Sequence, residues 1–141
     1  MAGQNEELMR AFYDEVLSGG DLDRIPELCT EDVVDHEAPP DMPKGIEGVK
    51  AFVQMYRGAF PDLRATVEDA FEQGDRAVAR VRYTGTHQGE LMGVAPSGRQ
   101  IDIQSIDIIR LADGKCVEHW GVTDNMALMQ QIGAIPQEAP A

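Results

Sequence analysis

The twelve residues Asp113-Gly-Lys-Cys-Val-Glu-His-Trp-Gly-Val-Thr-Asp124 combine a turn signal with a strand pattern. The opening Asp-Gly pair is typical of a tight β-hairpin turn. Side chains alternate between the two faces of a strand, so one face carries Cys116, Glu118, Trp120, Val122 and Asp124 and the other carries Val117, His119, Gly121 and Thr123. If the first face lines a cavity, an aromatic ring and a carboxylate share that cavity. His119 then points the opposite way, which favours a structural or interfacial role for it.

The rest of the chain shows two kinds of hydrophobic periodicity. Helical spacing predicts helices over residues 6–17 and 48–60, with shorter ones near residues 21–29 and 125–132. Alternation with a period of two predicts further strands at residues 63–72, 76–87 and 101–111, after a short extended segment at 30–36. Helices followed by antiparallel strands indicate an α+β fold, with helices packed on one face of a curved sheet.

Length and composition exclude several functional classes. The 141 residues fit a single domain, and the net charge of -13 opposes binding to nucleic acid phosphates or anionic membranes. We therefore expect a small molecule or another protein chain as the partner. Cys29 and Cys116 show no paired spacing and no signal-peptide pattern is present, so we expect two buried core thiols and a cytoplasmic location. The last residues, 137–141, are predicted to be a loose tail.

Asp124 has two competing interpretations. It precedes a short apolar helix, where aspartate commonly accepts backbone N–H bonds as a cap. Alternatively, a carboxylate beside Trp120 in a dry pocket would have a raised pKa, suited to proton transfer. Local spacing favours the cap, and only the second interpretation requires a cavity.

Other polar residues also stand at positions where chemistry is plausible. Asp107 shares a strand face with isoleucines and leucine, and a buried carboxylate needs a partner or a purpose. His87 ends a strand between glycines, where a ligand could approach closely. Tyr13 and Tyr56 lie on apolar helix faces and would bring hydroxyls to a cavity between helices and sheet.

Cofactor and metal motifs are absent from the sequence. The three histidines match no local metal-binding spacing, and there is no glycine-rich dinucleotide or phosphate loop. No Ser-His-Asp order with a nucleophile elbow is present either. We therefore expect neither a cofactor nor a metal.

Several short motifs in order resemble the SnoaL-like polyketide cyclase (ester cyclase) family over residues 5–133. They are Val34-Asp-His36, Phe60-Pro-Asp-Leu63, Gly74-Asp75, Gly85-Thr-His87-Gln-Gly89, Pro96-Ser-Gly98, Ile108-Ile-Arg110, Asp113-Gly-Lys115, Glu118-His-Trp120 and Gln131-Ile-Gly133. The resemblance implies the cone-shaped α+β fold of the nuclear transport factor and ketosteroid isomerase superfamily. Such a fold wraps a strongly curved, mostly antiparallel sheet over N-terminal helices and leaves a deep pocket.

The resemblance also implies an activity and a set of site residues. The activity is a cofactor-free intramolecular aldol condensation that closes a ring of a polyketide ester. The family's acid-base aspartate corresponds to Asp124, which reverses the preference for a purely capping role. His36, His87, Trp120 and Tyr13 match positions near the family's pocket and are expected to contact substrate, and Tyr56 and Asp107 are added to this set from their places in the sequence.

Two other functional classes compete with a cyclase. One is a non-catalytic module of the same fold that binds a small hydrophobic molecule. The other is an interaction protein that uses the outer sheet face, which carries charges of both signs. The resemblance implies a homodimer formed through that face.

Overall fold

The computed structural model describes residues 3–136, and its five strands form one sheet. The strands are β1 (Cys29–Asp35), β2 (Arg64–Gln73), β3 (Arg76–Thr86), β4 (Gln100–Ala112) and β5 (Lys115–Thr123). Their order is β1-β5-β4-β3-β2; β1 runs parallel to β5, and the other neighbouring pairs are antiparallel. The predicted α+β class with a mostly antiparallel sheet is confirmed. The tail predicted at 137–141 lies outside the described residues.

The turn at Asp113 and Gly114 joins β4 to β5. Asp113 and Gly114 both have positive φ angles, 51° and 78°, as a type I′ hairpin turn requires. Glycine adopts such angles without strain and aspartate tolerates them better than most residues, so the Asp-Gly pair directs the chain back on itself. β5 consequently pairs with β4 along nearly its whole length.

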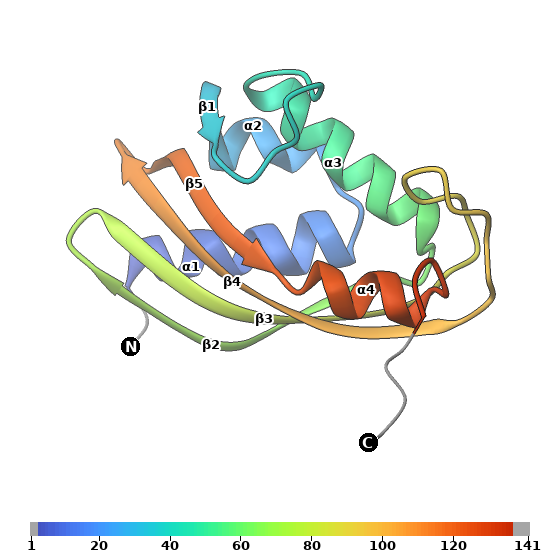
Figure 1. Ribbon diagram of the computed structural model, residues 1–141. Coiled ribbons are helices and arrows are strands. Elements are labelled where there is room, and N and C mark those ends of the chain that lie inside the picture. The colour runs from blue at the N-terminus through green and yellow to red at the C-terminus, as the bar shows by residue number, and fades with distance from the viewer. Residues whose placement is uncertain (1–2, 137–141) are drawn as a thin grey trace.

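Helices cover one face of this sheet (Figure 1). The first is α1 (Gln4–Ala11), which continues as the wider π-helical segment η1 (Phe12–Ser18). The short helices η2 (Leu22–Arg24) and α2 (Ile25–Leu28) lead into β1, and α3 (Ile46–Ala59) follows the loop after β1. The helix α4 (Asn125–Gln131) follows β5 directly.

The sheet curves around the helices (Figure 1). The strand register shifts between Val67 and Asp69 of β2 and between Arg110 and Leu111 of β4, and such irregularities bend a strand and increase its twist. On β4 every second residue from Ile101 to Leu111 is buried, and these side chains meet the helices in the core. Among residues 3–136, no helix is both long enough and apolar enough to cross a membrane.

Candidate active site

A cavity lies between the helices and the concave face of the sheet. Most of its wall is apolar, and this part includes Leu8 and Phe12 from the first helix and Val49 and Phe52 from α3. The polar side chains on the wall are contributed mainly by the sheet and by the start of the loop after β1; they are Tyr13, Asp35, Glu37, Tyr56, Tyr83, Asp107, His119 and Thr123. An apolar cavity with a few convergent polar groups is the usual form of a small-molecule site.

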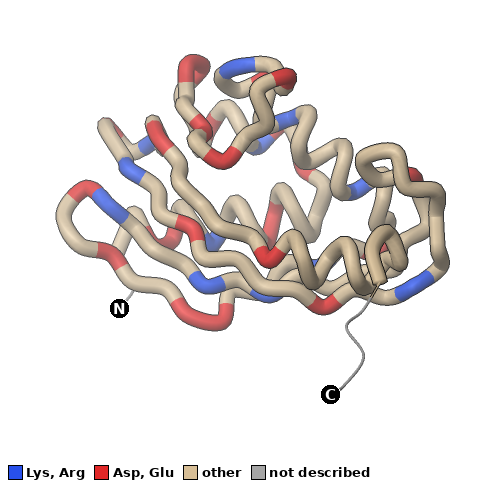
Figure 2. Tube along the Cα trace, in the orientation of Figure 1, with Lys and Arg blue, Asp and Glu red and all other residues tan. Residues whose placement is uncertain are grey.

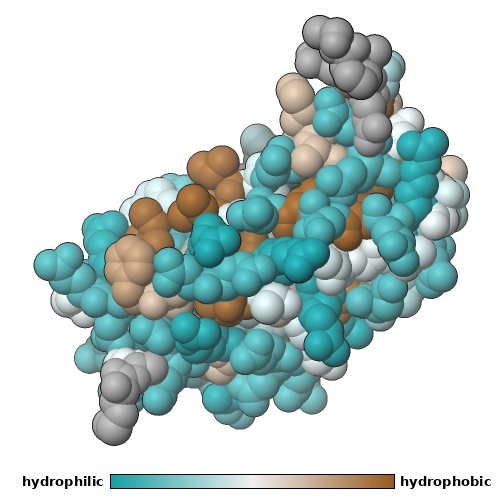
Figure 3. Space-filling view, turned by 90° about the horizontal axis from the view of Figure 1, so that it is seen from below, coloured by the Kyte–Doolittle hydropathy of each residue, from teal (hydrophilic) through white to brown (hydrophobic). Residues whose placement is uncertain are grey.

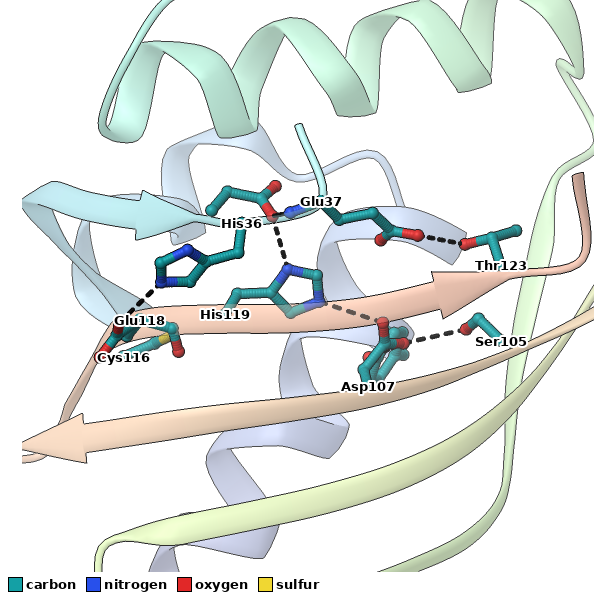
Figure 4. Close-up of polar contacts among 10 residues, drawn as sticks. His36, Glu37, Ser105, Asp107, Cys116, Glu118, His119 and Thr123 are labelled. Atoms are coloured by element: carbon teal, nitrogen blue, oxygen red, sulfur yellow. Dashed lines mark hydrogen bonds and ion pairs between the residues drawn. The ribbon is translucent and has the colours of Figure 1, made fainter. Parts of the chain in front are cut away.

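His119 on β5 lies between two carboxylates (Figure 4). Its Nδ1 is 2.7 Å from Oδ1 of Asp35 on β1, and its Nε2 is 3.0 Å from Oδ1 of Asp107 on β4. Because carboxylates accept hydrogen bonds and do not donate them, both ring nitrogens donate and the imidazole carries a positive charge. Burial lowers the pKa of His119, but the hydrogen bonds to Asp107 and Asp35 and the charges of these carboxylates together outweigh it and raise the pKa to about 10.

Asp107 is the most deeply buried carboxylate of this group, with only 3% of its surface exposed. Its Oδ2 accepts hydrogen bonds from the Tyr13 hydroxyl at 2.6 Å and from the Ser105 hydroxyl at 2.9 Å, while Oδ1 faces His119. Three donors to one carboxylate offset the cost of burying its charge. A buried Asp107 was expected to need a hydrogen-bond partner, and the structure provides three donors, from η1, β4 and β5.

Glu37 places a third carboxylate next to this pair. It follows β1 on the loop over the cavity, and its Oε2 accepts a hydrogen bond from the Thr123 hydroxyl at 2.8 Å. Burial raises the pKa of Glu37 and the charge of Asp107 adds to the rise, although the bond from Thr123 opposes it. Glu37 is thus a carboxyl of the cavity wall whose raised pKa favours its protonated form.

Gly121 provides the space in which these groups meet. A Cβ atom on Gly121 would lie 2.4 Å from Oδ1 of Asp107, 2.8 Å from Oε1 of Glu37 and 3.0 Å from Cε1 of His119. All three distances are at or below the limit at which real Cβ atoms make contacts. Any larger residue here would displace the Asp107 or Glu37 carboxylate, so glycine is favoured by close approach and not by backbone conformation.

Glu37, Asp107 and His119 are also the described residues that could hold a metal ion, provided that Nε2 of His119 gives up its proton. One donor atom from each lies within 4.8 Å of the others. Each donor residue is oriented by a further hydrogen bond, from Thr123 to Glu37, from Tyr13 to Asp107 and from His119 to Asp35. The three residues are distant in the sequence, so a search for local metal-binding spacing could not find them.

The family model described as SnoaL-like polyketide cyclase matches residues 7–132. The chain belongs to the SnoaL-like polyketide cyclase family. It is 26% identical to aklanonic acid methyl ester cyclase DauD of Streptomyces sp. (strain C5), over 93% of this chain and 73% of that protein. It is 30% identical to nogalonic acid methyl ester cyclase of Streptomyces nogalater, over 70% of this chain and 78% of that protein.

Solved structures show the same family likeness. TsrD from Streptomyces laurentii superposes with a TM-score of 0.86 at 30% identity, covering 94% of this chain and 96% of that one. IdmH from Streptomyces antibioticus superposes with a TM-score of 0.80 at 34% identity, covering 93% of this chain and 99% of that one. This SnoaL-like chain therefore shares the fold of these proteins over almost its whole length.

The structure does not place Asp124 in the cavity of this SnoaL-like protein. Its Oδ1 accepts the backbone N–H of Ala127 at 3.0 Å, so it caps α4, and its side chain is exposed and absent from the cavity wall. Asp124 was expected within reach of a cavity ligand, and in the structure it caps α4 and does not line the cavity. The reason is strand parity: Asp107 pairs with Gly121 and Ser105 with Thr123, so the inward positions of β5 end at Thr123.

Trp120 and His36 lie away from the cavity, although both were expected to contact substrate. The two rings stack with centroids 5.0 Å apart and planes 9° apart, and the Arg76 guanidinium lies 4.8 Å from the Trp120 ring centroid. Nε2 of His36 donates to Oε2 of Glu118 at 2.7 Å. Neither ring contributes to the cavity wall, because these side chains belong to the opposite face from His119.

His87 is buried but does not line the cavity either. Its Nδ1 accepts the backbone N–H of Ser97 at 3.1 Å, and its ring lies 5.7 Å from that of Phe60. Its Nε2 has no hydrogen-bond partner among the described residues. His87 therefore holds the loop between β3 and β4 against the core.

Tyr13, Tyr56 and Asp107 do line the cavity, as their places in the sequence suggested. Burial and the charge of Asp107 raise the pKa of Tyr13 well above its ordinary value, and burial raises that of Tyr56 to about 12. Both phenols therefore stay protonated and can donate hydrogen bonds near neutral pH.

The sequence analysis did not identify Asp35, Glu37 and Thr123 as site residues, and it expected His119 to point away from the cavity that it lines. Alternation along β5 was correctly expected to separate His119 from Trp120. The clue to the inward face was Asp107, a carboxylate among isoleucines on the neighbouring strand, because its register partner on β5 is Gly121. Cys116 also faces the cavity despite its parity, because the register shift between Arg110 and Leu111 of β4 changes the pairing there.

Proposed function

We propose that this protein closes a ring in a polyketide ester by intramolecular aldol condensation, using side chains alone and no cofactor. The observation that carries the proposal is the network of Asp35, His119 and Asp107 at the polar end of an otherwise apolar cavity. The family membership supplies the reaction class, since the relatives DauD and the Streptomyces nogalater enzyme are methyl ester cyclases. The proton carriers are those on the cavity wall, and Asp124 is not among them.

Asp107 is the base of the proposed reaction. Its Oδ1 accepts one hydrogen bond, from His119, whereas Oδ2 accepts two, from Tyr13 and Ser105, so Oδ1 keeps the lone pair that takes the proton. It removes the acidic proton from the carbon between the ester and a neighbouring carbonyl, and the electron pair delocalises onto oxygen as an enolate. The positive imidazole of His119 stands next to this charge and stabilises it electrostatically.

Glu37 is the acid that completes the cycle. When the enolate carbon attacks the second carbonyl, the oxygen of that carbonyl gains the displaced electron pair and takes the proton of Glu37. The raised pKa of Glu37 favours the protonated form that this role needs. The proton left on Asp107 then returns to Glu37, because a carboxylate oxygen of Glu37 lies within 4.8 Å of one of Asp107. Both groups thereby regain their starting states.

The first half-reaction can be measured without ring closure. The enzyme is incubated in D₂O with a β-keto methyl ester that carries a distant ketone, and exchange of the central C–H is followed by NMR. We expect exchange in the wild type, and a loss of about 10² to 10⁴-fold in Asp107→Asn. Glu37→Gln should still exchange the proton but fail to form the ring.

Matched controls separate this proposal from its alternatives. Asp124→Asn should retain full exchange and ring closure. An inactive Asp124→Asn variant would instead show that Asp124 carries the proton. Treatment with EDTA should leave activity unchanged, whereas its loss would show that Glu37, Asp107 and His119 hold a catalytic metal. Saturable binding of the ester with no exchange would favour the non-catalytic binding module.

We also propose that two copies associate through the outer face of the sheet. The strand register aligns Phe71, Val78, Ile108 and Trp120 in one row across β2, β3, β4 and β5. Phe71, Ile106 and Val122 are all more than half exposed, and hydrophobic residues gather among hydrophilic ones on this side (Figure 3). Charges of both signs follow the strands (Figure 2), as a self-complementary interface between identical copies needs.

Light scattering tests this association. A dimer mass at micromolar concentration is expected for the wild type, and Ile106→Glu combined with Val122→Glu should give a monomer. A monomeric wild type would contradict the proposal. Because the cavity lies on the opposite face, ligand binding serves as the control for folding.

A further inference from the structure

Cys29 and Cys116 are far apart in the sequence but adjacent in the sheet. Cys29 begins β1 and Cys116 lies near the start of β5, and the two are Cα partners in the parallel pairing of these strands. Both are free thiols, both are buried, and both belong to the cavity wall. The proposed aldol chemistry uses neither, so this inference is independent of it.

The geometry is compatible with a covalent bond between the two sulfurs. Neighbouring strands lie about 4.8 Å apart, within the roughly 4.4 to 6.8 Å that a disulfide spans between Cα atoms. β1 is an edge strand, and its pairing with β5 becomes irregular after Cys29. The start of β1 therefore has room to adjust to a short covalent link.

The two thiols are chemically unequal. The adjacent Cys29 thiol lowers the pKa of Cys116, although burial opposes this, and the positive His119 further along β5 contributes to the lowering. In its protonated state the Cys116 thiol donates to the backbone carbonyl of Glu118 at 3.5 Å. The neighbouring Cys116 thiol, together with burial, raises the pKa of Cys29. Cys116 is therefore the better nucleophile, and Cys29 is the protonated partner beside it.

We propose that Cys29 and Cys116 form an oxidisable dithiol, which a peroxide small enough to enter the cavity converts to an intramolecular disulfide. The Cys116 thiolate attacks one peroxide oxygen, the O–O bond breaks, and hydroxide leaves a sulfenic acid on Cys116. The Cys29 sulfur then attacks the Cys116 sulfur; the S–O bond breaks, and water leaves with the Cys29 proton. Two electrons pass from the sulfurs to hydrogen peroxide, which ends as two molecules of water.

The disulfide would connect the oxidation state of the thiols to the polar network. β1 carries Cys29 at its start and Asp35 at its end, and Asp35 pairs in register with His119. Fixing the start of β1 to β5 limits how that strand can move relative to His119. Oxidation should therefore alter cavity binding without any change in the residues of the network.

The experiment uses the intact protein treated with hydrogen peroxide and analysed by mass spectrometry. We expect the loss of the mass of two hydrogen atoms, and a peptide pair joined through Cys29 and Cys116 after digestion without reductant. An anilinonaphthalene sulfonate dye bound in the cavity should slow this reaction. A native protein that shows only higher oxidation states, or only links between molecules, would overturn the proposal.

Single substitutions test the order of the two steps. Cys29→Ser should leave a sulfenic acid on Cys116 that dimedone traps, because the resolving thiol is gone. Cys116→Ser should react about tenfold more slowly or not at all, since the remaining thiol is protonated. Equal dimedone labelling in the two variants would contradict the unequal roles. The mass change in the wild type decides the proposal even if either variant fails to fold.

Discussion

The charge of His119 makes a quantitative prediction about stability and pH. In an unfolded chain its pKa is near 6.5, and the hydrogen bonds to Asp107 and Asp35 raise it to about 10 in the folded protein. A raised pKa in the folded state adds stability that is fully present below pH 6.5. That contribution is lost progressively as the pH rises from 6.5 and is absent above about pH 10.

The size of the effect follows from the same two values. Each pKa unit corresponds to about 1.4 kcal/mol, so the change from 6.5 to about 10 corresponds to at most roughly 5 kcal/mol. Solvent reaches part of the imidazole, whose side chain is 22% exposed, so the measured loss should be smaller, on the order of 2 to 4 kcal/mol. That is a large share of the total stability of a small domain.

Urea unfolding at several pH values between 6 and 10 measures this loss, and NMR titration of the imidazole gives the pKa directly. The signal is assigned with His119→Gln. In Asp35→Asn one of the two carboxylates becomes neutral, so the pKa of His119 should fall by about one unit or more. A wild-type His119 that titrates below pH 7, with flat stability up to pH 10, would refute the assignment of a buried imidazolium.

Three further substitutions and one control substitution test the site. Gly121→Ala should abolish activity and cost about 1 to 3 kcal/mol of stability, because its Cβ would meet Asp107 and Glu37. The control Gly58→Ala should be tolerated, because its Cβ meets nothing within 4 Å. Equal effects of the two substitutions in thermal melts and exchange assays would contradict this prediction. Tyr13→Phe should lose about 1.5 to 3 kcal/mol in urea unfolding by removing a donor to Asp107, and unchanged stability would show that hydrogen bond to be unimportant. Asp124→Ala should lower stability by about 1 kcal/mol through the lost cap and leave kcat unchanged, and an inactive, stable variant would oppose the capping role.

Local sequence signals were sufficient for most of the fold. The alternating stretches predicted β2, β3, β4 and β5, and the Asp-Gly turn predicted the hairpin between the last two. These signals are reliable because side-chain direction along a strand and positive φ in a turn are properties of a few neighbouring residues. The odd carboxylate Asp107 likewise signalled a buried network before its partners were known.

Only the tertiary structure decided which side of β5 faces the cavity. Strand alternation separates His119 from Trp120 but does not state which of the two points inward, and the inward face was assigned to the wrong set. The choice depends on the packing of β5 between β4 and the edge strand β1, and on the parallel pairing that brings Asp35 and Cys29 from more than 80 residues away. Such contacts join segments that share no local pattern, so the sequence fixes the alternation while the packed sheet determines that His119, and not Asp124, reaches the cavity.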